Sequence, residues 1–284
     1  MKIISQIKLR YLLNLSALIC MTAVIILLES FSTLAATDKT QSDILNNAAD
    51  LSTKLDQYWQ NAKNEVYKSV LELIAQDQSE LEKNLKFSKL MHGDTTKKQI
   101  AITFDDGPHP EFTPKLLDLL DKYNIKATFF LVGEMAEKNP ELVRAEVAAG
   151  HSIGNHTFHH VNLKKIPESD VATEIKACGE VLENITGKPP HLFRPPGGDY
   201  DKSVALVSEA LGYKMILWTD DPGDYLNPGD KVIERKILSR IDNGGIILVH
   251  DGIQQTLDVL PRIIEHLKNE GYEFVTIDQM LINK

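Results

Sequence analysis

The sequence predicts a parallel α/β fold over residues 98–284, preceded by a leader and a helical segment. Short apolar runs alternate with amphipathic stretches about seven times after residue 98, which is the pattern of parallel strands joined by helical crossovers. Ionisable residues gather directly after the apolar runs, where parallel folds carry their binding and catalytic groups. The composition, 43% hydrophobic and 25% charged, is that of a globular chain and not of a disordered one.

Residues 1–36 are expected to be a signal peptide or a membrane anchor. Basic residues precede an apolar run at 11–28, and the small residues Thr33 and Ala35 then suit signal peptidase. The run is long for a cleaved signal and short for a membrane span, which typically takes about 20 residues. A cleaved secretory signal is the preferred interpretation, and a retained anchor is the alternative. Either one exports the rest of the chain, to the periplasm, the cell envelope or the medium.

Residues 37–97 are expected to form a helical stalk or a small pre-domain. The sequence from 37 to 91 is polar and contains no Pro or Gly, and apolar residues such as Ile44, Leu51 and Leu55 recur at spacings of three and four. The apolar seam is too irregular to predict a coiled-coil dimer. A spacer between the leader and the domain is therefore the plainer interpretation.

Charge and cysteine content exclude two classes of interaction. The formal net charge of −9 argues against a nucleic-acid partner, because binding to phosphates needs clustered Lys and Arg. Outside the leader, which holds Cys20, only Cys178 remains, so no internal disulfide can form. Cys178 is expected to be a small buried residue on a helix.

The repeating region divides into elements by its apolar pattern. Short apolar runs suit buried strands of a parallel sheet, and apolar residues at spacings of three and four suit the helices that cover it. The expected strands are 99–104, 127–132, 152–154, 192–193, 214–218, 245–249 and 273–277. The expected helices are 114–123, 140–149, 169–186, 202–211, 231–241 and 257–270.

Polar residues at the strand ends indicate a site. Asp105 and Asp106 follow the first strand, and two adjacent carboxylates at the edge of a core repel each other unless a cation offsets them. Taken alone, the pair could equally cap an Asp-Gly turn. The later strand ends favour the site, because they bring further ionisable groups to the same rim: the histidines of 156–160, Arg194, Asp220, Asp221, Asp224, His250 and Asp251.

His156 and His160 are candidate metal ligands. Their i, i+4 spacing predicts that both imidazoles lie on one face of a helical turn. Two imidazole nitrogens and one carboxylate oxygen form a three-ligand site with open positions, as catalytic zinc requires. The spacing alone is a weak signal, and His151 and His159 compete for the role. His159 is expected to be exposed.

Arg194 and His250 have both a functional and a plainer interpretation. Arg194 precedes two prolines that stiffen its loop and present the guanidinium to an acidic group, although an ordinary salt bridge would look the same. His250 ends an apolar strand, where its charge change near neutral pH suits proton transfer. A histidine bonded to a backbone carbonyl is the alternative there.

Five stretches in this order resemble the polysaccharide deacetylase family, the NodB-homology domain of carbohydrate esterase family 4. They are TFDDGP at 103–108, HTFHH at 156–160, RPPGG at 194–198, DDPGD at 220–224 and IILVH at 246–250. The resemblance covers 98–277 and none of the preceding helical segment. It implies a deformed (β/α) barrel of about seven strands and a catalytic domain at 98–284.

The resemblance also implies a metal centre with an acid and a base. Carried over residue by residue, Asp106, His156 and His160 would hold a divalent metal, usually zinc. Asp105 would be the general base, and His250 would be the general acid. Such a site suits amide hydrolysis, since a metal polarises the carbonyl while a base activates water and an acid protonates the leaving amine.

The resemblance also implies residues that orient these catalytic groups or contact the substrate. Arg194 would orient Asp105, and Asp224 would pair with His250. The backbone N–H of Gly197 would help to hold the oxyanion, and Leu248 would line the acetyl pocket. The chain departs from the family at two positions, with Gly197 where Tyr is common and Tyr225 where Trp is frequent. Both departures would reshape the sugar subsites.

The implied function is a metal-dependent hydrolase of linear amides that removes N-acetyl groups from a polymer containing N-acetylglucosamine. Peptidoglycan is the first expectation for the substrate, because an exported enzyme would meet the wall, and chitin oligosaccharides are the second. An O-acetyl esterase acting on xylan and a non-catalytic glycan-binding module are the alternatives. A phosphoryl-transfer enzyme built on Asp105 lacks a Gly-rich phosphate cradle.

Overall fold

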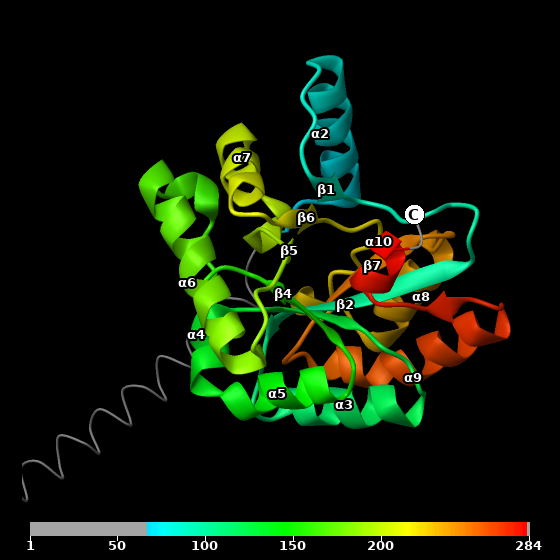
Figure 1. Ribbon diagram of the computed structural model, residues 1–284. Helices are drawn as coiled ribbons and strands as arrows, with labels where there is room; N and C mark the ends of the chain where they lie inside the picture. The colour runs from blue at the N-terminus through cyan, green and yellow to red at the C-terminus, as the bar shows by residue number, and fades with distance from the viewer. Residues whose placement is uncertain (1–66, 283–284) are drawn as a thin grey trace, which may run out of the picture. The chain divides into compact units, whose positions relative to one another are not determined.

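Eight parallel strands form one sheet at the centre of residues 67–282, the part that the computed structural model describes (Figure 1). The strands are β1 Lys89–Leu90, β2 Gln99–Gly107, β3 Thr128–Leu131, β4 Ser152–Asn155, β5 Leu192–Phe193, β6 Lys214–Ile216, β7 Gly245–His250 and β8 Glu273–Phe274. Their order across the sheet is β1-β6-β5-β4-β3-β2-β7, with β8 paired to β2. The sheet curls into a half-barrel, which confirms the predicted parallel α/β class.

The last expected strand, 273–277, is shorter in the structure. β8 pairs with β2 only through Glu273 and Phe274. Thr276 then caps helix α10, because its hydroxyl accepts from the backbone N–H of Gln279 while the Gln279 side chain accepts from the Thr276 N–H. This reciprocal pair is a capping box, and it ends the extended backbone.

Helices cover the sheet and connect its strands (Figure 1). They are α2 Val70–Glu82, α3 Phe112–Lys122, α4 Gly133–Lys138, α5 Pro140–Ala148, α6 Glu168–Thr186, α7 Lys202–Ala210, α8 Asp230–Arg240, α9 Gln254–Asn269 and α10 Ile277–Ile282. Helix α6 packs on α4, α5 and α7, and α9 packs on α3 and α8. Three short 3-10 turns lie in the connections: η1 Leu163–Lys165, η2 Pro196–Gly198 and η3 Asp224–Leu226.

Two apolar clusters lie on the two faces of the sheet. Along β2, Ile100 and Ile102 belong to the cluster beneath α3 and α9, whereas Ala101 belongs to the other cluster. Along β7, Leu248 joins the same cluster as Ala101. This alternation is the two-residue period of a strand whose faces are both buried. Leu248, the residue expected at an acetyl pocket, is fully buried there.

The predictions for residues 1–66, namely the leader, the apolar run at 11–28 and most of the stalk, lie outside the described residues. The described residues all belong to the unit of the chain that begins at Asn61. Among residues 67–282, no helix has both the length and the apolar character that crossing a bilayer requires.

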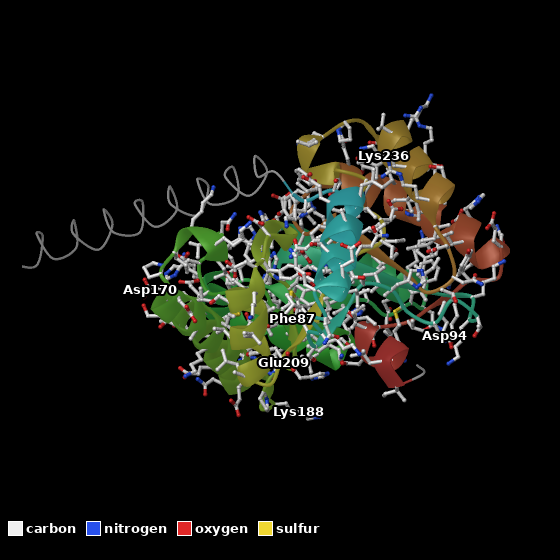
Figure 2. All side chains as sticks on the ribbon, turned by 90° about the horizontal axis from the view of Figure 1, so that it is seen from above. Phe87, Asp94, Asp170, Lys188, Glu209 and Lys236 are labelled. Carbon is white, nitrogen blue, oxygen red and sulfur yellow. The ribbon has the colours of Figure 1, made fainter. Side chains whose placement is uncertain are left out.

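The described end of the predicted stalk is docked on the domain. Helix α2 begins with a capping box between Ser69 and Glu72 and rises from the end of the sheet near β1 and β6 (Figure 1). The view from above places α2 over the domain (Figure 2). The Gln76 amide donates to the Tyr200 carbonyl at 3.2 Å, and Lys89 pairs with Asp77 and Glu80. A simple spacer does not describe this helix.

The sheet begins upstream of residue 98, the start expected for the catalytic domain. Lys89 and Leu90 form β1, which pairs with Met215 and Ile216 of β6. Leu90 is buried in the core. A two-residue strand among charged residues carries too little apolar pattern to be predicted from sequence.

Substitution Lys89→Met is expected to destabilise the docked helix. The methionine keeps the bulk but leaves the nearly buried Glu80 carboxylate without its cation, which should lower the free energy of unfolding by about 2 kcal/mol. Urea denaturation measures the change. The control is Lys115→Met, which breaks the exposed ion pair with Glu111 and should leave stability unchanged. Equal stability in both variants would contradict the docking.

Candidate metal and catalytic site

Asp105 and Asp106 lie at the end of β2, where a β-bulge turns both carboxylates toward the same histidine. The pairing of β2 with β3 shifts between Asp105 and Gly107, and Asp106 has a φ of 73°. Adjacent residues of a regular strand point to opposite faces. Here one oxygen of Asp105 and one of Asp106 lie 3.6 and 3.5 Å from Nε2 of His156. The bulge thus makes one site from two consecutive residues.

His156 and His160 are brought together by a loop, so the expected helical turn was wrong. The loop follows β4, and its backbone has positive φ at Thr157 (67°) and His160 (54°). The Asn155 side chain accepts from the Thr157 N–H at 2.9 Å, and the Thr157 carbonyl accepts from the Gly133 N–H. These bonds fix a non-helical path, yet the two imidazole centroids lie only 4.8 Å apart.

The donor atoms of Asp106, His156 and His160 form a buried cluster in which all lie within 4.8 Å of one another. Asp106 Oδ1 lies 3.1 Å from Nε2 of His160. The Arg194 carbonyl accepts from Nδ1 of His156 at 2.7 Å, which leaves the Nε2 lone pair facing the carboxylates. Asp106 Oδ1 and His156 Nε2 have no hydrogen-bond partner among the described residues. Two imidazole nitrogens and one carboxylate oxygen suit a divalent metal.

The histidines also determine the charge of Asp106. Burial alone would raise the pKa of the Asp106 carboxyl, but His160 and then His156 hold it well below its ordinary value. The carboxylate is therefore ionised at neutral pH, as a metal ligand must be.

Arg194 is fully buried, and its guanidinium forms a hydrogen-bonded ion pair with Asp105. Nη1 donates to Asp105 Oδ1 and to the Thr103 hydroxyl, both at 2.7 Å, and Nε donates to the Ile216 carbonyl at 3.1 Å. The guanidinium also lies 4.1 Å from the ring centroid of Phe130. Thr103 and Phe130 were missed from sequence, because a threonine and a phenylalanine within apolar strands carry no signal of this contact.

His250 ends β7 and is held by Asp224. The Asp224 carboxylate accepts from Nδ1 of His250 at 2.7 Å and from its backbone N–H at 2.8 Å, and it also accepts from the Thr256 hydroxyl. Burial alone would lower the pKa of His250, but the Asp224 carboxylate raises it to about 9. Nε2 of His250 is buried and has no hydrogen-bond partner among the described residues. The imidazole is therefore protonated at neutral pH.

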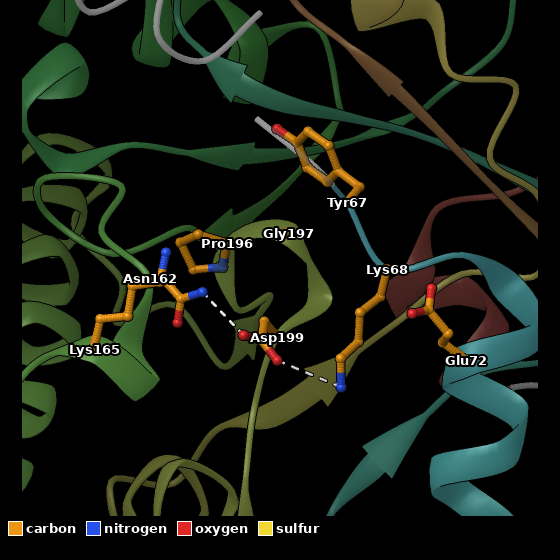
Figure 3. A pocket seen from close by; sticks show the side chains of 8 residues that line it. All are labelled: Tyr67, Lys68, Glu72, Asn162, Lys165, Pro196, Gly197 and Asp199. Atoms are coloured by element: carbon orange, nitrogen blue, oxygen red, sulfur yellow. Dashed lines mark hydrogen bonds and ion pairs between the residues drawn. The ribbon is translucent and has the colours of Figure 1, made fainter. Parts of the chain in front are cut away.

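Gly197 and Tyr225 lie at the margin of this centre. Gly197 is in η2 with a φ of 63°, and Tyr225 is in η3 with its ring 5.2 Å from that of His250. A cavity of about 390 Å³ opens beside Gly197 (Figure 3). Its lining residues are Tyr67, Lys68, Glu72, Asn162, Lys165, Pro196, Gly197 and Asp199. Tyr67 was missed from sequence, since it lies in the segment assigned to the stalk.

The other candidates lie apart from the cluster. His159 is exposed, as expected, and it pairs with Glu174. His151 accepts from the Ala127 N–H at 3.1 Å, and burial lowers its pKa to about 4. Cys178 is a buried residue of helix α6, which confirms that expectation.

Comparison with known proteins identifies the family. Residues 92–216 match the family model described as polysaccharide deacetylase. A peptidoglycan-N-acetylglucosamine deacetylase of Bacillus cereus is 40% identical over 190 residues, which are 65% of this chain and 89% of the relative. The chain belongs to the polysaccharide deacetylase family. The chain is therefore a polysaccharide deacetylase enzyme. Its Asp106–His156–His160 cluster agrees with the divalent metal that deacetylases of this family use.

Two further matches agree with this membership of the polysaccharide deacetylases. A crystal structure of a peptidoglycan N-acetylglucosamine deacetylase, solved with a bound N-oxidanyl-benzamide, is 36% identical with a TM-score of 0.68 and covers 71% of this chain and 95% of that one. The peptidoglycan-N-acetylmuramic acid deacetylase PdaA of Bacillus subtilis is 32% identical and covers 70% of this chain and 77% of the relative.

Proposed function

We propose that this polysaccharide deacetylase removes the N-acetyl group from N-acetylglucosamine residues of peptidoglycan, with zinc at Asp106, His156 and His160. The observation that carries the proposal is the meeting of these three donors with Asp105 and His250 at one end of the sheet. The 40% identical relative named for this substrate supports the choice of sugar. Residues 98–284, together with strand β1 at Lys89–Leu90, would form the catalytic domain.

Asp105 is the general base in this proposal. A bound zinc ion would polarise the acetyl carbonyl and lower the pKa of water. Asp105 accepts a proton from the attacking water, whose oxygen bonds to the carbonyl carbon. Arg194 holds one Asp105 oxygen at 2.7 Å, so the other oxygen is left to take the proton. The backbone N–H of Gly197 stabilises the negative oxygen that develops.

His250 is the general acid. It gives its Nε2 proton to the amide nitrogen as the C–N bond breaks, releasing acetate and a free amine on the sugar. Asp224 holds Nδ1 and stabilises the charged imidazole. Leu248 and Tyr225 would line the space for the acetyl methyl group, and the 390 Å³ cavity beside Gly197 would receive the neighbouring sugar.

Substitution Asp224→Asn is expected to move the alkaline limb of the pH profile. A general acid works while protonated, so kcat/KM of the wild type should fall as the pH rises through the raised pKa of His250, about 9. Asparagine removes the carboxylate charge but keeps a similar shape, so the pKa of His250 falls and activity is lost at lower pH. Profiles of kcat/KM against pH for both proteins measure the shift. An unchanged limb would contradict the role of His250.

Acetate release tests the proposed function. Purified protein is incubated with peptidoglycan, with chitin oligosaccharides and with acetylated xylan, and acetate is measured with and without a chelator. We expect release from peptidoglycan that stops with chelator and returns with added zinc. Mass spectrometry of the digested product should place the free amine on glucosamine. A free amine on muramic acid would assign the substrate of the Bacillus subtilis relative instead, whereas glycan binding without acetate release would favour a non-catalytic module.

We propose that the leader expected at residues 1–36 exports the enzyme. The apolar run at 11–28 with its basic flank would direct the chain across the membrane, as a cleaved signal or as a retained anchor. The catalytic domain would then face peptidoglycan. N-terminal sequencing of the exported protein distinguishes the two forms, because cleavage would expose a residue near position 37.

A further inference from the structure

We propose that Tyr67, which precedes helix α2, is a positioning residue of the metal centre. The inference rests on the proposed metal ligands and adds a group from outside the strand-and-helix repeat. The Tyr67 hydroxyl donates to Oδ2 of Asp106 at 3.3 Å. The other oxygen, Oδ1, lies 3.5 Å from Nε2 of His156 and 3.1 Å from Nε2 of His160. The phenol thus holds one carboxylate oxygen while the other faces the imidazoles.

The ring of Tyr67 packs against the proposed catalytic acid and its neighbours. Its centroid lies 4.8 Å from that of His250 and 4.5 Å from that of Tyr225, with Trp218 in an edge contact at 6.4 Å. Only 5% of Tyr67 is exposed. A buried phenol usually bonds a polar partner, and the carboxylate of Asp106 is such a partner here.

The chain on the C-terminal side of Tyr67 holds the ring in place. The Lys68 N–H donates to the Gly197 carbonyl at 2.9 Å, and its ammonium pairs with Asp199 at 3.4 Å (Figure 3). Figure 3 shows the Tyr67 and Lys68 side chains pointing to opposite sides of the backbone. Ser69 then caps α2, which is itself bonded to the domain. Docking of α2 and the Lys68 contacts therefore position the phenol.

The matched pair Tyr67→Phe and Tyr123→Phe tests the inference. Tyr67→Phe removes the bond to Asp106 and keeps the ring, so the dissociation constant for Zn²⁺ should rise about 10-fold, with a similar fall in kcat and little change in KM. Tyr123→Phe removes a phenol-to-carboxylate bond of 2.8 Å to Glu265 on the surface and should change neither value. Zinc affinity is measured by competition with a chromophoric chelator, and unfolding midpoints of the metal-free proteins confirm that both variants are folded.

Two results would overturn the inference. Wild-type zinc affinity and kcat in Tyr67→Phe would show that the ring only packs. Faster acetate release by Tyr67→Ala than by wild type would show that the segment obstructs the site. Zinc affinity also separates this inference from the proposed function: weakened binding in Tyr67→Phe would support it even if the wild type released no acetate from any glycan.

Discussion

Asp106→Ala is expected to lose metal binding and acetate release together. Asp106 supplies the carboxylate oxygen of the three-donor cluster, and its removal leaves two imidazoles with no anionic ligand. Two neutral ligands hold a divalent ion far more weakly, because the carboxylate contributes both a bond and a charge. We expect less than 1 zinc ion per ten chains after dialysis, a roughly tenfold or greater loss of occupancy, and no acetate above background.

The control for this variant is Asp258→Ala on helix α9, whose carboxylate accepts an exposed hydrogen bond from Gln254. It should retain one zinc ion and full activity. Zinc content by atomic emission, measured beside acetate release, distinguishes loss of metal from loss of rate. Full zinc occupancy in Asp106→Ala would exclude this carboxylate as a ligand.

Asp105→Asn is expected to retain metal and lose rate. The asparagine oxygen can still accept from Nη1 of Arg194, so the loop geometry should persist. A neutral amide cannot take a proton from water, which should lower kcat by roughly 100- to 10,000-fold. The variant should also be less stable, because the buried guanidinium of Arg194 loses its counter-charge.

Steady-state kinetics and zinc content of Asp105→Asn provide the comparison with Asp106→Ala. The two residues are adjacent in sequence, so a general disturbance of the β2 end would affect metal and rate alike in both variants. Separate outcomes, with metal lost in one and rate lost in the other, support distinct roles. Equal loss of metal in both would show that these two roles are wrongly divided.

Much of the site could be predicted because functional groups of a parallel α/β fold gather at the carboxyl ends of its strands. Asp105, His156, Arg194 and His250 are up to 145 residues apart, yet each lies in the last residues of a strand or directly after it, and parallel strands end at one edge of the sheet. Their convergence therefore follows from the order of the elements. The apolar runs that revealed the strands also revealed where the polar groups would meet.

Local backbone geometry could not be predicted in the same way. The i, i+4 spacing of His156 and His160 suggested a helical turn, whereas positive φ angles at Thr157 and His160 make it a loop. The bulge at Asp106 likewise depends on how β2 pairs with β3. Spacing counts residues but does not determine φ, and contacts with other segments decide between conformations of similar energy.

The docking of helix α2 also could not be predicted from the sequence. The helix lies within the segment whose apolar spacing of three and four predicts a helix, but that pattern does not identify the residues on which α2 docks. Docking depends on two contacts, from Gln76 to Tyr200 and from Lys89 to Glu80. In the sequence alone, none of these polar residues is distinguished from a surface residue. The contact of Tyr67 with Asp106 likewise could not be predicted, because it depends on where the segment before α2 docks.

X-ray absorption spectroscopy of the zinc-loaded protein tests the central claim most directly, since it reports the atoms bound to the metal. The account predicts one zinc ion per chain with two imidazole nitrogens and carboxylate or water oxygens at about 2.0–2.2 Å. His156→Ala should remove one imidazole contribution from the spectrum. A spectrum without imidazole scattering, or one that His156→Ala leaves unchanged, would contradict it.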